Sequence, residues 1–404
     1  MNGFDFDKEY GIVLEGGGAK GAYQIGVWKA FLEHGVKIKG VSGVSVGALN
    51  GALIAMGDFN EAERIWSDMT YSKVMNVNDE QMDNLMQGKI KDLSIKEITK
   101  DTTKIIMDRG IDITPLKRLI NEWVDEEKIS NSDIELVLGT FSINKMKEIE
   151  ISAKEAEPGY LKDYFLASAY LPAFKSEKLH GNSYLDGGIL NSVPVDMLIN
   201  RGYKNIIIVR IFGIGINKPV KIPKDVNIIE IAPRIDLGGI LEFNKAKINR
   251  NIKVGYYDGL RVLRSLKGKI YYLNWDFNEE KSLIYLFKVN EAVKMALLEY
   301  YKLDISKPIL YDRYFIESAC PMMANTLKLS KGWTYEELLL SLFELSAKTL
   351  RIQKYNVYTR EEFSDLIHSK YKVKMENEEK FPLFEELVLK LVTIREDKSI
   401  LTHE

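Results

Sequence analysis

Residues 40–51, Gly-Val-Ser-Gly-Val-Ser-Val-Gly-Ala-Leu-Asn-Gly, join a short apolar run to a segment that favours helix. They contain the pattern Gly43-x-Ser45-x-Gly47, which is typical of a nucleophile elbow, a sharp turn between a strand and a helix. Glycine is needed on both sides of the serine because a Cβ would collide with the neighbouring strand and helix. The helix dipole and free backbone N–H groups at such a turn stabilise negative charge. Ser45 is therefore a candidate nucleophile, and an ordinary turn of small residues is the alternative.

The composition of the chain is that of a globular protein without a dominant charge. Of 404 residues, 46% are hydrophobic and 28% are charged, and the net charge is -2. This balance argues against nucleic acid as a partner. Residues 1–10 lack the apolar core of a signal peptide, and no apolar run reaches transmembrane length. We therefore expect a cytoplasmic protein with no transmembrane segment and with at most a peripheral attachment to membranes.

Cysteine and histidine are scarce, which restricts the chemistry. The single cysteine, Cys320, excludes an intramolecular disulfide and a cysteine-based zinc site, and neither a metal nor an organic cofactor is predicted. His34 is expected at a helix end, and His368 and His403 lie in the helical tail of the chain. His180 precedes a predicted strand and stays open as a candidate base for a serine nucleophile.

A second unit of strand, turn and helix precedes the elbow. Residues 10–14 are apolar and run directly into Glu-Gly-Gly-Gly-Ala-Lys-Gly at 15–21, and residues 22–33 have helical spacing. Two consecutive units of this kind predict a parallel sheet with right-handed crossovers. The spacing Gly16-x-Gly18-x-x-Gly21 also fits a dinucleotide-binding loop, but residues 36–42 lack the acidic residue that would hold a ribose. Binding of a cofactor phosphate and a plain structural turn stay open as alternatives.

The glycine loop has a specific use next to a nucleophile. Turns that follow adjacent parallel strands lie side by side at one edge of the sheet, so Gly17 and Gly18 can lie beside Ser45. Their backbone N–H groups would then point at the oxygen of a tetrahedral intermediate. Removal of one such donor typically costs roughly 3 to 4 kcal/mol of transition-state stabilisation. The loop and the elbow therefore support each other.

Asp186 is the preferred candidate base. It follows Tyr184-Leu185 at a predicted strand end, and Gly187 and Gly188 after it leave the carboxylate open. A carboxylate is a weak base in water, so it could deprotonate Ser45 only where partial burial raises its pKa and a direct hydrogen bond holds the pair. A turn aspartate in an Asp-Gly loop is the alternative interpretation.

The pattern of elements changes near residue 276. Before it, strands are predicted over residues 136–143, 148–152, 206–211, 228–231 and 269–273, and a capping box at Ser94 and Glu97 predicts a helix start. After it, only helix signals are found, over residues 283–301, 334–354, 359–371 and 381–395. We therefore expect an all-helical C-terminal domain over residues 276–404. Its apolar faces would form a bundle core, and its helices are also a candidate dimer interface.

Three motifs in this order resemble the signatures of the patatin-like phospholipases: Gly16-Gly17-Gly18-Ala19-Lys20-Gly21, Gly43-Val44-Ser45-Val46-Gly47 and Asp186-Gly187-Gly188. Weaker patterns at residues 112–116 and 167–172 also resemble that family, and the resemblance covers roughly residues 8–275. It implies an α/β domain over 8–275, a three-layer α/β/α fold with a mainly parallel sheet. It also implies a Ser-Asp dyad without histidine.

The resemblance assigns roles to the motif residues. Ser45 would be the nucleophile, Asp186 the base and Gly16, Gly17 and Gly18 the oxyanion hole, with Lys20 in the basic position of the glycine motif. The implied reaction is hydrolysis of fatty-acyl esters of phospholipids or lysophospholipids at a membrane surface. The competing hypothesis is a non-catalytic protein that holds a phosphate or nucleotide in the glycine loop and a partner on its helical domain.

Overall fold

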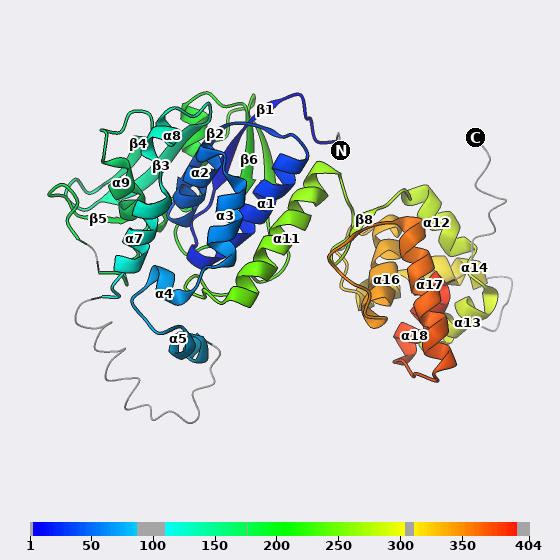
Figure 1. Ribbon diagram of the computed structural model, residues 1–404. Coiled ribbons are helices and arrows are strands. Elements are labelled where there is room, and N and C mark those ends of the chain that lie inside the picture. The colour runs from blue at the N-terminus through cyan, green and yellow to red at the C-terminus, as the bar shows by residue number, and fades with distance from the viewer. Residues whose placement is uncertain (1–2, 87–109, 176, 304–310, 394–404) are drawn as a thin grey trace. The chain divides into compact units, whose positions relative to one another are not determined.

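The computed structural model describes residues 3–86, 110–175, 177–303 and 311–393 (Figure 1). It divides into two compact units, Met1–Leu263 and Arg264–Glu404. The helix start predicted from Ser94 and Glu97 lies outside the described residues, as does His403. No helix of the described part is both long and apolar enough to cross a bilayer.

A seven-stranded sheet forms the centre of the first unit, in the order β4-β3-β2-β1-β6-β7, with β5 paired to β3. The strands are β1 (Glu9–Leu14), β2 (Lys37–Val44), β3 (Glu135–Ser142), β4 (Lys147–Ser152), β5 (Tyr184–Asp186), β6 (Asn205–Val209) and β7 (Asn227–Ile231). The pairs that join β3, β2, β1, β6 and β7 are parallel, whereas β4 and β5 pair antiparallel with β3. The predicted mainly parallel α/β sheet is confirmed.

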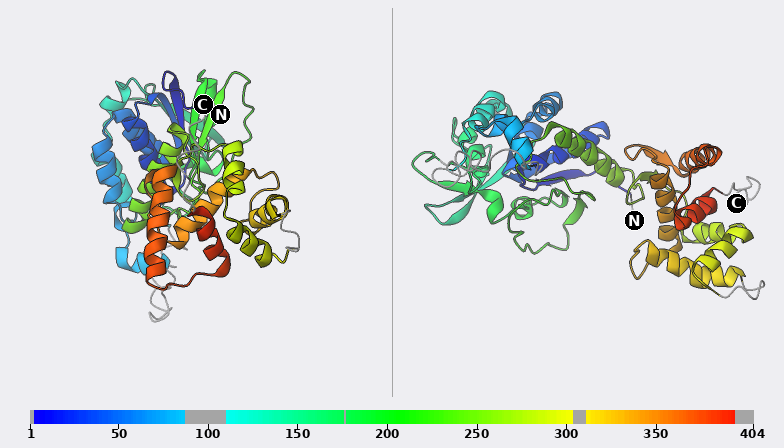
Figure 2. Two further views of the ribbon diagram at one scale, coloured as in Figure 1. Left: turned by 90° about the vertical axis from the view of Figure 1, so that its right-hand side faces the viewer. Right: turned by 90° about the horizontal axis from the view of Figure 1, so that it is seen from below.

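Helices cover both faces of this sheet. They are α1 (Ala22–Glu33), α2 (Val46–Met56), α3 (Phe59–Ser67), α4 (Tyr71–Val74), α5 (Asp79–Met86), α7 (Thr114–Trp123), α8 (Glu126–Ser130), α9 (Leu161–Ser168), α10 (Val195–Asn200) and α11 (Lys245–Leu263). Successive residues of β1 face opposite layers: Val13 packs with Val195 and Leu198 of α10, and Leu14 reaches Gly51 of α2. In Figure 1, α1, α2, α3 and α11 lie in front of the strands, and Figure 2 gives two further views.

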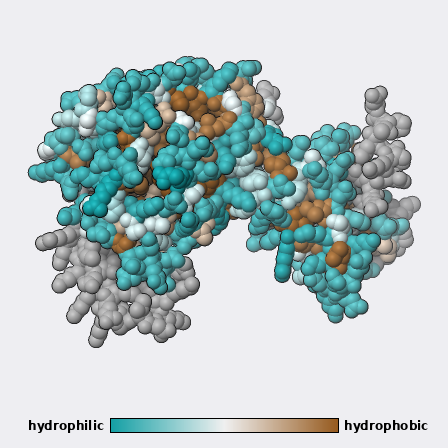
Figure 3. Space-filling view, viewed as in Figure 1, coloured by the Kyte–Doolittle hydropathy of each residue, from teal (hydrophilic) through white to brown (hydrophobic). Residues whose placement is uncertain are grey.

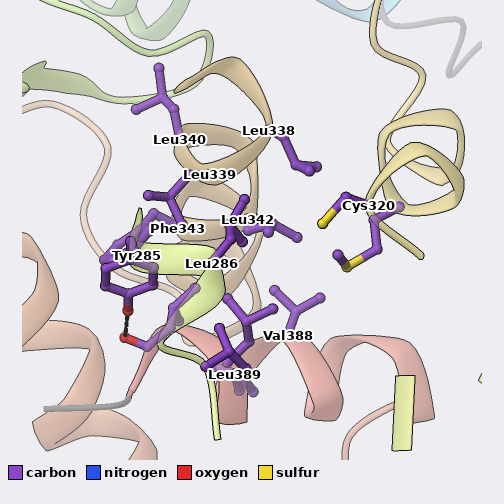
Figure 4. Packing of buried hydrophobic residues seen from close by; sticks show 14 of the residues in the cluster. Tyr285, Leu286, Cys320, Leu338, Leu339, Leu340, Leu342, Phe343, Val388 and Leu389 are labelled. Carbon is purple, nitrogen blue, oxygen red and sulfur yellow. Dashed lines mark hydrogen bonds between the residues drawn. The ribbon is translucent and has the colours of Figure 1, made fainter. Parts of the chain in front are cut away.

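The second unit is mainly helical and has its own core. Its helices are α12 (Glu279–Phe287), α13 (Glu291–Tyr300), α14 (Tyr311–Tyr314), α15 (Cys320–Thr326), α16 (Tyr335–Thr349), α17 (Arg360–Glu376) and α18 (Leu383–Val392). Figure 4 shows side chains of α12, α16 and α18 packed together, with the Tyr285 hydroxyl donating to the Val392 carbonyl at 3.2 Å. Leu338 and Leu387, from the two apolar faces expected to form a bundle core, are buried here.

One expectation for this region is wrong. The run at 269–273 is predicted to be a last strand of the α/β domain, but β8 (Tyr272–Asn274) pairs in parallel with β9 (Val357–Thr359). Tyr271 is buried in the core of the second unit, and its N–H donates to the Glu344 carboxylate at 2.8 Å. The second unit therefore contains a small sheet besides its helices. The contacts divide the chain at Leu263, and the domain limits 8–275 and 276–404 stay a prediction.

The described residues present a mostly hydrophilic surface on the face seen in Figure 3. Figure 3 shows hydrophobic residues gathered in a few patches on the face seen in Figure 1. Exposed large apolar residues occur on every folded protein, so only their clustering beside a functional site is informative.

Candidate active site

Ser45 lies at the sharp turn between β2 and α2. Its backbone has φ 53° and ψ -129°, a conformation that L-residues avoid and that costs about 1 to 3 kcal/mol. A Cβ on Gly43 would collide with the Gly47 carbonyl group, and one on Gly47 would collide with the Leu14 carbonyl. Both flanking glycines are therefore required for the helix to approach the strands this closely.

Strand β5 brings Asp186 to this turn from the opposite direction. On β3, Gly139 is the partner of Val44 in β2, and the next residue, Thr140, is the partner of Asp186 in β5. The other edge of β3 is occupied by β4. Strands β2 and β5 therefore pair with the same edge of β3, one after the other along its length. Asp186 lies at the point where β2 ends and the chain turns into the elbow. The register of the sheet brings Ser45 and Asp186 together.

The Asp186 carboxyl is in an unusual environment. The residue is 2% exposed, its Oδ1 accepts a hydrogen bond from the Gly188 N–H at 2.7 Å, and its Oδ2 is buried without a hydrogen bond from any described residue. Burial raises the pKa of this carboxyl to about 6, against opposing effects of the Ser45 side chain and the Gly188 N–H. The Ser45 side chain thus lies close enough to lower the pKa of Asp186, although Oδ2 accepts no hydrogen bond from it.

Ser168, the last residue of α9, joins the two candidates. It is fully buried, its hydroxyl donates to the Gly139 carbonyl at 2.6 Å, and its oxygen accepts the Ser45 N–H at 2.8 Å. Two residues later, the Tyr170 carbonyl accepts the Asp186 N–H at 2.8 Å. One short segment therefore holds the main chain of both residues. The sequence pattern marked this segment but gave Ser168 no role.

The glycine loop lies directly against the elbow. A Cβ built on Gly16 would lie 3.3 Å from the Ser45 Cβ. The Gly16 N–H donates to the Ser192 carbonyl at 3.2 Å, so it is already engaged. No acceptor among the described residues takes the N–H of Gly17 or Gly18. The geometry thus leaves two of the three expected oxyanion donors available.

Glu15 and Lys20 fix the segment at residues 210–213 against this loop. The Glu15 carboxylate is buried and accepts hydrogen bonds from the N–H groups of residues 211–213, at 2.6, 3.0 and 3.3 Å, and from the Arg210 guanidinium at 2.9 Å. Lys20 Nζ donates to the Phe212 carbonyl at 2.6 Å. None of the predicted roles falls on Glu15, although a carboxylate directly after a buried strand was an available signal.

Comparison with known proteins identifies this part of the chain. Residues 12–199 match the family model described as patatin-like phospholipase. These residues form a patatin-like phospholipase domain. The patatin-like domain contains Ser45, Asp186 and the glycine loop, so all three motifs belong to the matched region.

The curated relatives are much longer proteins. Neuropathy target esterase sws of Drosophila melanogaster is 27% identical over 212 residues, which are 49% of this chain and 12% of that protein. Lysophospholipase NTE1 of Mycosarcoma maydis is 26% identical over 224 residues, 52% of this chain and 10% of that protein. Among solved structures, VipD from Legionella pneumophila is 14% identical, with a TM-score of 0.39 over 98% of this chain and 92% of that one. The chain thus spans a small part of the curated relatives it matches.

The histidines of the described residues are engaged away from the patatin-like site. His180 Nε2 lies 2.8 Å from Asp163 Oδ2, and its ring stacks on Tyr160 at 3.6 Å between centroids. His34 and His368 each lie within hydrogen-bond distance of a backbone carbonyl in their own unit, and His34 is at a helix end as predicted. No three His, Cys, Asp or Glu side chains of the described residues are arranged as metal ligands.

An apolar cavity of about 70 Å³ lies beside Ser45 in the first unit. Its lining includes Leu49, Leu53, Ile65, Trp66, Leu116, Leu119, Trp123, Phe174 and Phe243. Small-molecule sites usually measure about 300 to 1,000 Å³, so this cavity holds only part of a ligand unless its walls move. An open depression of about 690 Å³ along α7 and α8 is lined by polar residues such as Asp125 and Glu126 and contains none of the predicted site residues.

Proposed function

We propose that the patatin-like domain hydrolyses fatty-acyl esters of phospholipids or lysophospholipids through a Ser45–Asp186 dyad. The observation that carries this proposal is the Ser45 hydroxyl beside a buried carboxyl whose pKa is raised to about 6. A carboxylate with a raised pKa is a stronger base and is still ionised at neutral pH. A lysophospholipase among the relatives supports a lipid ester as the substrate.

The proposed reaction has two halves. Asp186 takes the Ser45 proton as Oγ attacks the acyl carbonyl carbon, and the N–H groups of Gly17 and Gly18 stabilise the oxyanion. The ester C–O bond then breaks, and the leaving alcohol receives the proton from Asp186. Water, deprotonated by Asp186, attacks the acyl-serine, and the fatty acid leaves as Ser45 recovers its proton. The apolar cavity beside Ser45 receives the first part of the acyl chain.

The competing hypothesis, a phosphate or nucleotide held in the glycine loop, has less support. Lys20 is the cation of that loop, and its Nζ donates one hydrogen bond to the Phe212 carbonyl. The buried Glu15 carboxylate directly before the glycines already binds the Arg210 guanidinium, so this cation is not available to a phosphate. The expected cytoplasmic location and dimer interface stay predictions.

The decisive experiment is labelling and turnover of matched variants. Ser45→Ala and Asp186→Asn should each lower hydrolysis of a soluble p-nitrophenyl ester by roughly 10³-fold or more, and a fluorophosphonate probe should react at Ser45 of the parent chain only. Ser152→Ala, which removes another buried serine hydroxyl of the same unit, should change neither the rate of ester hydrolysis nor the labelling of Ser45. Parent-level turnover by Ser45→Ala would refute the dyad.

The pH dependence gives a second arm of this test. Asp186 must be ionised to act as a base, so kcat/KM should be constant above pH 7. It should fall about tenfold per pH unit below the pKa of about 6. A profile that stays flat to pH 4.5 would show that another group is the base.

A further inference from the structure

Three large apolar side chains face solvent on one short loop of the first unit. In the sequence Phe212-Gly213-Ile214-Gly215-Ile216, the three apolar residues are 51%, 72% and 58% exposed, respectively. Side chains of this kind are normally buried, and a cluster of them on a surface marks an interaction site.

The two glycines between them face the protein. A Cβ on Gly213 would collide with the Gly16 carbonyl, and a Cβ on Gly215 would collide with the Gly188 carbonyl. The loop is therefore packed between the glycine loop and the turn that follows Asp186, with no room for larger residues on its inner side. Its outer side consists of the exposed apolar side chains, whereas large apolar side chains usually face the interior of a protein.

Hydrogen bonds hold this loop at both ends. Glu15 accepts from the N–H groups of residues 211–213, the Ile216 N–H donates to the Ile189 carbonyl at 3.1 Å, and the Ser192 N–H donates to the Ile216 carbonyl at 2.9 Å. The backbone is thus already ordered, which lowers the entropic cost of binding. Leu190 follows Ile189, whose carbonyl accepts the Ile216 N–H, and is itself 38% exposed.

We propose that residues 212–216 contact a phospholipid bilayer and that Phe212, Ile214 and Ile216 insert between its headgroups. This proposal rests on the proposed function, because a lipid ester has to reach Ser45 from the bilayer. The loop contacts the glycine loop and the turn after Asp186, which both lie beside that serine. Of the cations near this loop, Arg210 pairs with Glu15 and Lys218 with Asp196. The Nζ of Lys20 donates to the Phe212 carbonyl of the loop itself. Attachment therefore depends on apolar insertion and does not require anionic lipid.

The test is co-sedimentation with vesicles of ether-linked phosphatidylcholine, which a lipid esterase cannot hydrolyse. The parent chain should bind, and Ile214→Ser combined with Ile216→Ser should lower its partition coefficient roughly tenfold or more. High salt should leave the partition of the parent unchanged. Leu32→Ser is the matched control, because Leu32 is 48% exposed in the same unit. It lies at the end of α1, just before β2 begins, and therefore at the opposite end of the parallel strands from residues 212–216.

Each other outcome overturns the proposal. Failure of the parent to bind vesicles, equal binding by the double variant, or an equal loss in Leu32→Ser would each exclude this loop as the contact. A change in oligomeric state of the double variant without vesicles would assign the loop to a second copy of the chain. Thermal unfolding of each variant checks that it is folded. No turnover occurs in this assay, so failure of the proposed hydrolysis would appear only in the p-nitrophenyl ester assay.

Discussion

Burial of Asp186 has a cost in stability that follows from its pKa. The folded-state pKa of about 6 lies above the ordinary value of 3.8, so the folded chain retains this proton while the unfolded chain has lost it. The contribution of this carboxyl to the free energy of unfolding therefore falls as the pH rises from about 4 to about 6, and the loss is complete above that window. A shift of this size corresponds to about 3 kcal/mol.

Asp186→Asn should therefore stabilise the protein while it removes the proposed base. At pH 8 we expect its free energy of unfolding to exceed that of the parent by about 1 to 3 kcal/mol, because a neutral amide replaces a buried charge. At pH 4 the difference should be small, since the parent carboxyl is then protonated too. Urea unfolding at both pH values measures this.

Asp163→Asn is the control for that measurement, because its carboxylate pairs with His180 at a partly exposed site. It should not gain stability at pH 8. A stability gain in Asp186→Asn that is the same at pH 4 and pH 8 would argue against a charge effect.

Among the elements, α9 ends in a segment that binds the main chain of both Ser45 and Asp186. Ser168→Ala would leave the Ser45 N–H without its acceptor in a turn that is already strained. We expect kcat for a soluble ester to fall roughly 10- to 100-fold with little change in KM, because the nucleophile is displaced while the cavity is intact. The rate of fluorophosphonate labelling should fall in parallel. Ser168→Thr keeps the hydroxyl and should recover part of the rate.

A matched control for this variant is Ser282→Ala in the second unit, which also removes a fully buried serine hydroxyl. It should change neither kcat nor labelling. Loss of thermal stability in Ser168→Ala without any change in kcat would mean that the residue has only a structural role.

The features that could be predicted involve residues close together in the sequence, whereas the missed ones involve contacts between residues far apart in it. The elbow at Ser45, the glycine loop and the Asp-Gly turn each need particular residues within a few positions, so a local pattern records them. Ser168 acts through Gly139, and the engagement of the Gly16 N–H depends on Ser192. Such contacts join distant segments and leave no periodic signal, so the sequence indicated the segments but not their roles.

The same reasoning explains the errors in the second unit. Strand β9 is only three residues long, and β8 overlaps a run that resembles the strands of the sheet before it. Neither has the alternation or length that would indicate its partner. The mainly parallel sheet and the helical character of the tail were predictable, because glycine turns and long apolar faces recur over many residues.

At the scale of the whole molecule, the division after Leu263 predicts where the chain can be cut. Residues 1–263 should fold alone and hydrolyse a soluble ester within about threefold of the full chain, because the predicted site lies within the first unit. A chain that ends at 280 should be less soluble, since Tyr271, Leu273 and Trp275 would lose the core that buries them.

Light scattering of both truncated chains and of the full chain measures solubility and oligomeric state together. A dimeric full chain with a monomeric 1–263 chain would support the dimer interface predicted on the C-terminal helices. An unfolded 1–263 chain, or a well-behaved chain ending at 280, would contradict the division after Leu263.

The antiparallel docking of β5 also has a consequence for protein synthesis. A ribosome makes the elbow and the glycine loop early, yet Asp186 can take its place only after β3 has formed an edge for it to join. If Ser45 and Asp186 form the proposed dyad, a nascent chain that has emerged only as far as Phe174 contains the nucleophile Ser45 without its base. Such a chain should be unable to attack membrane lipids during translation, and this delay requires no inhibitor or propeptide.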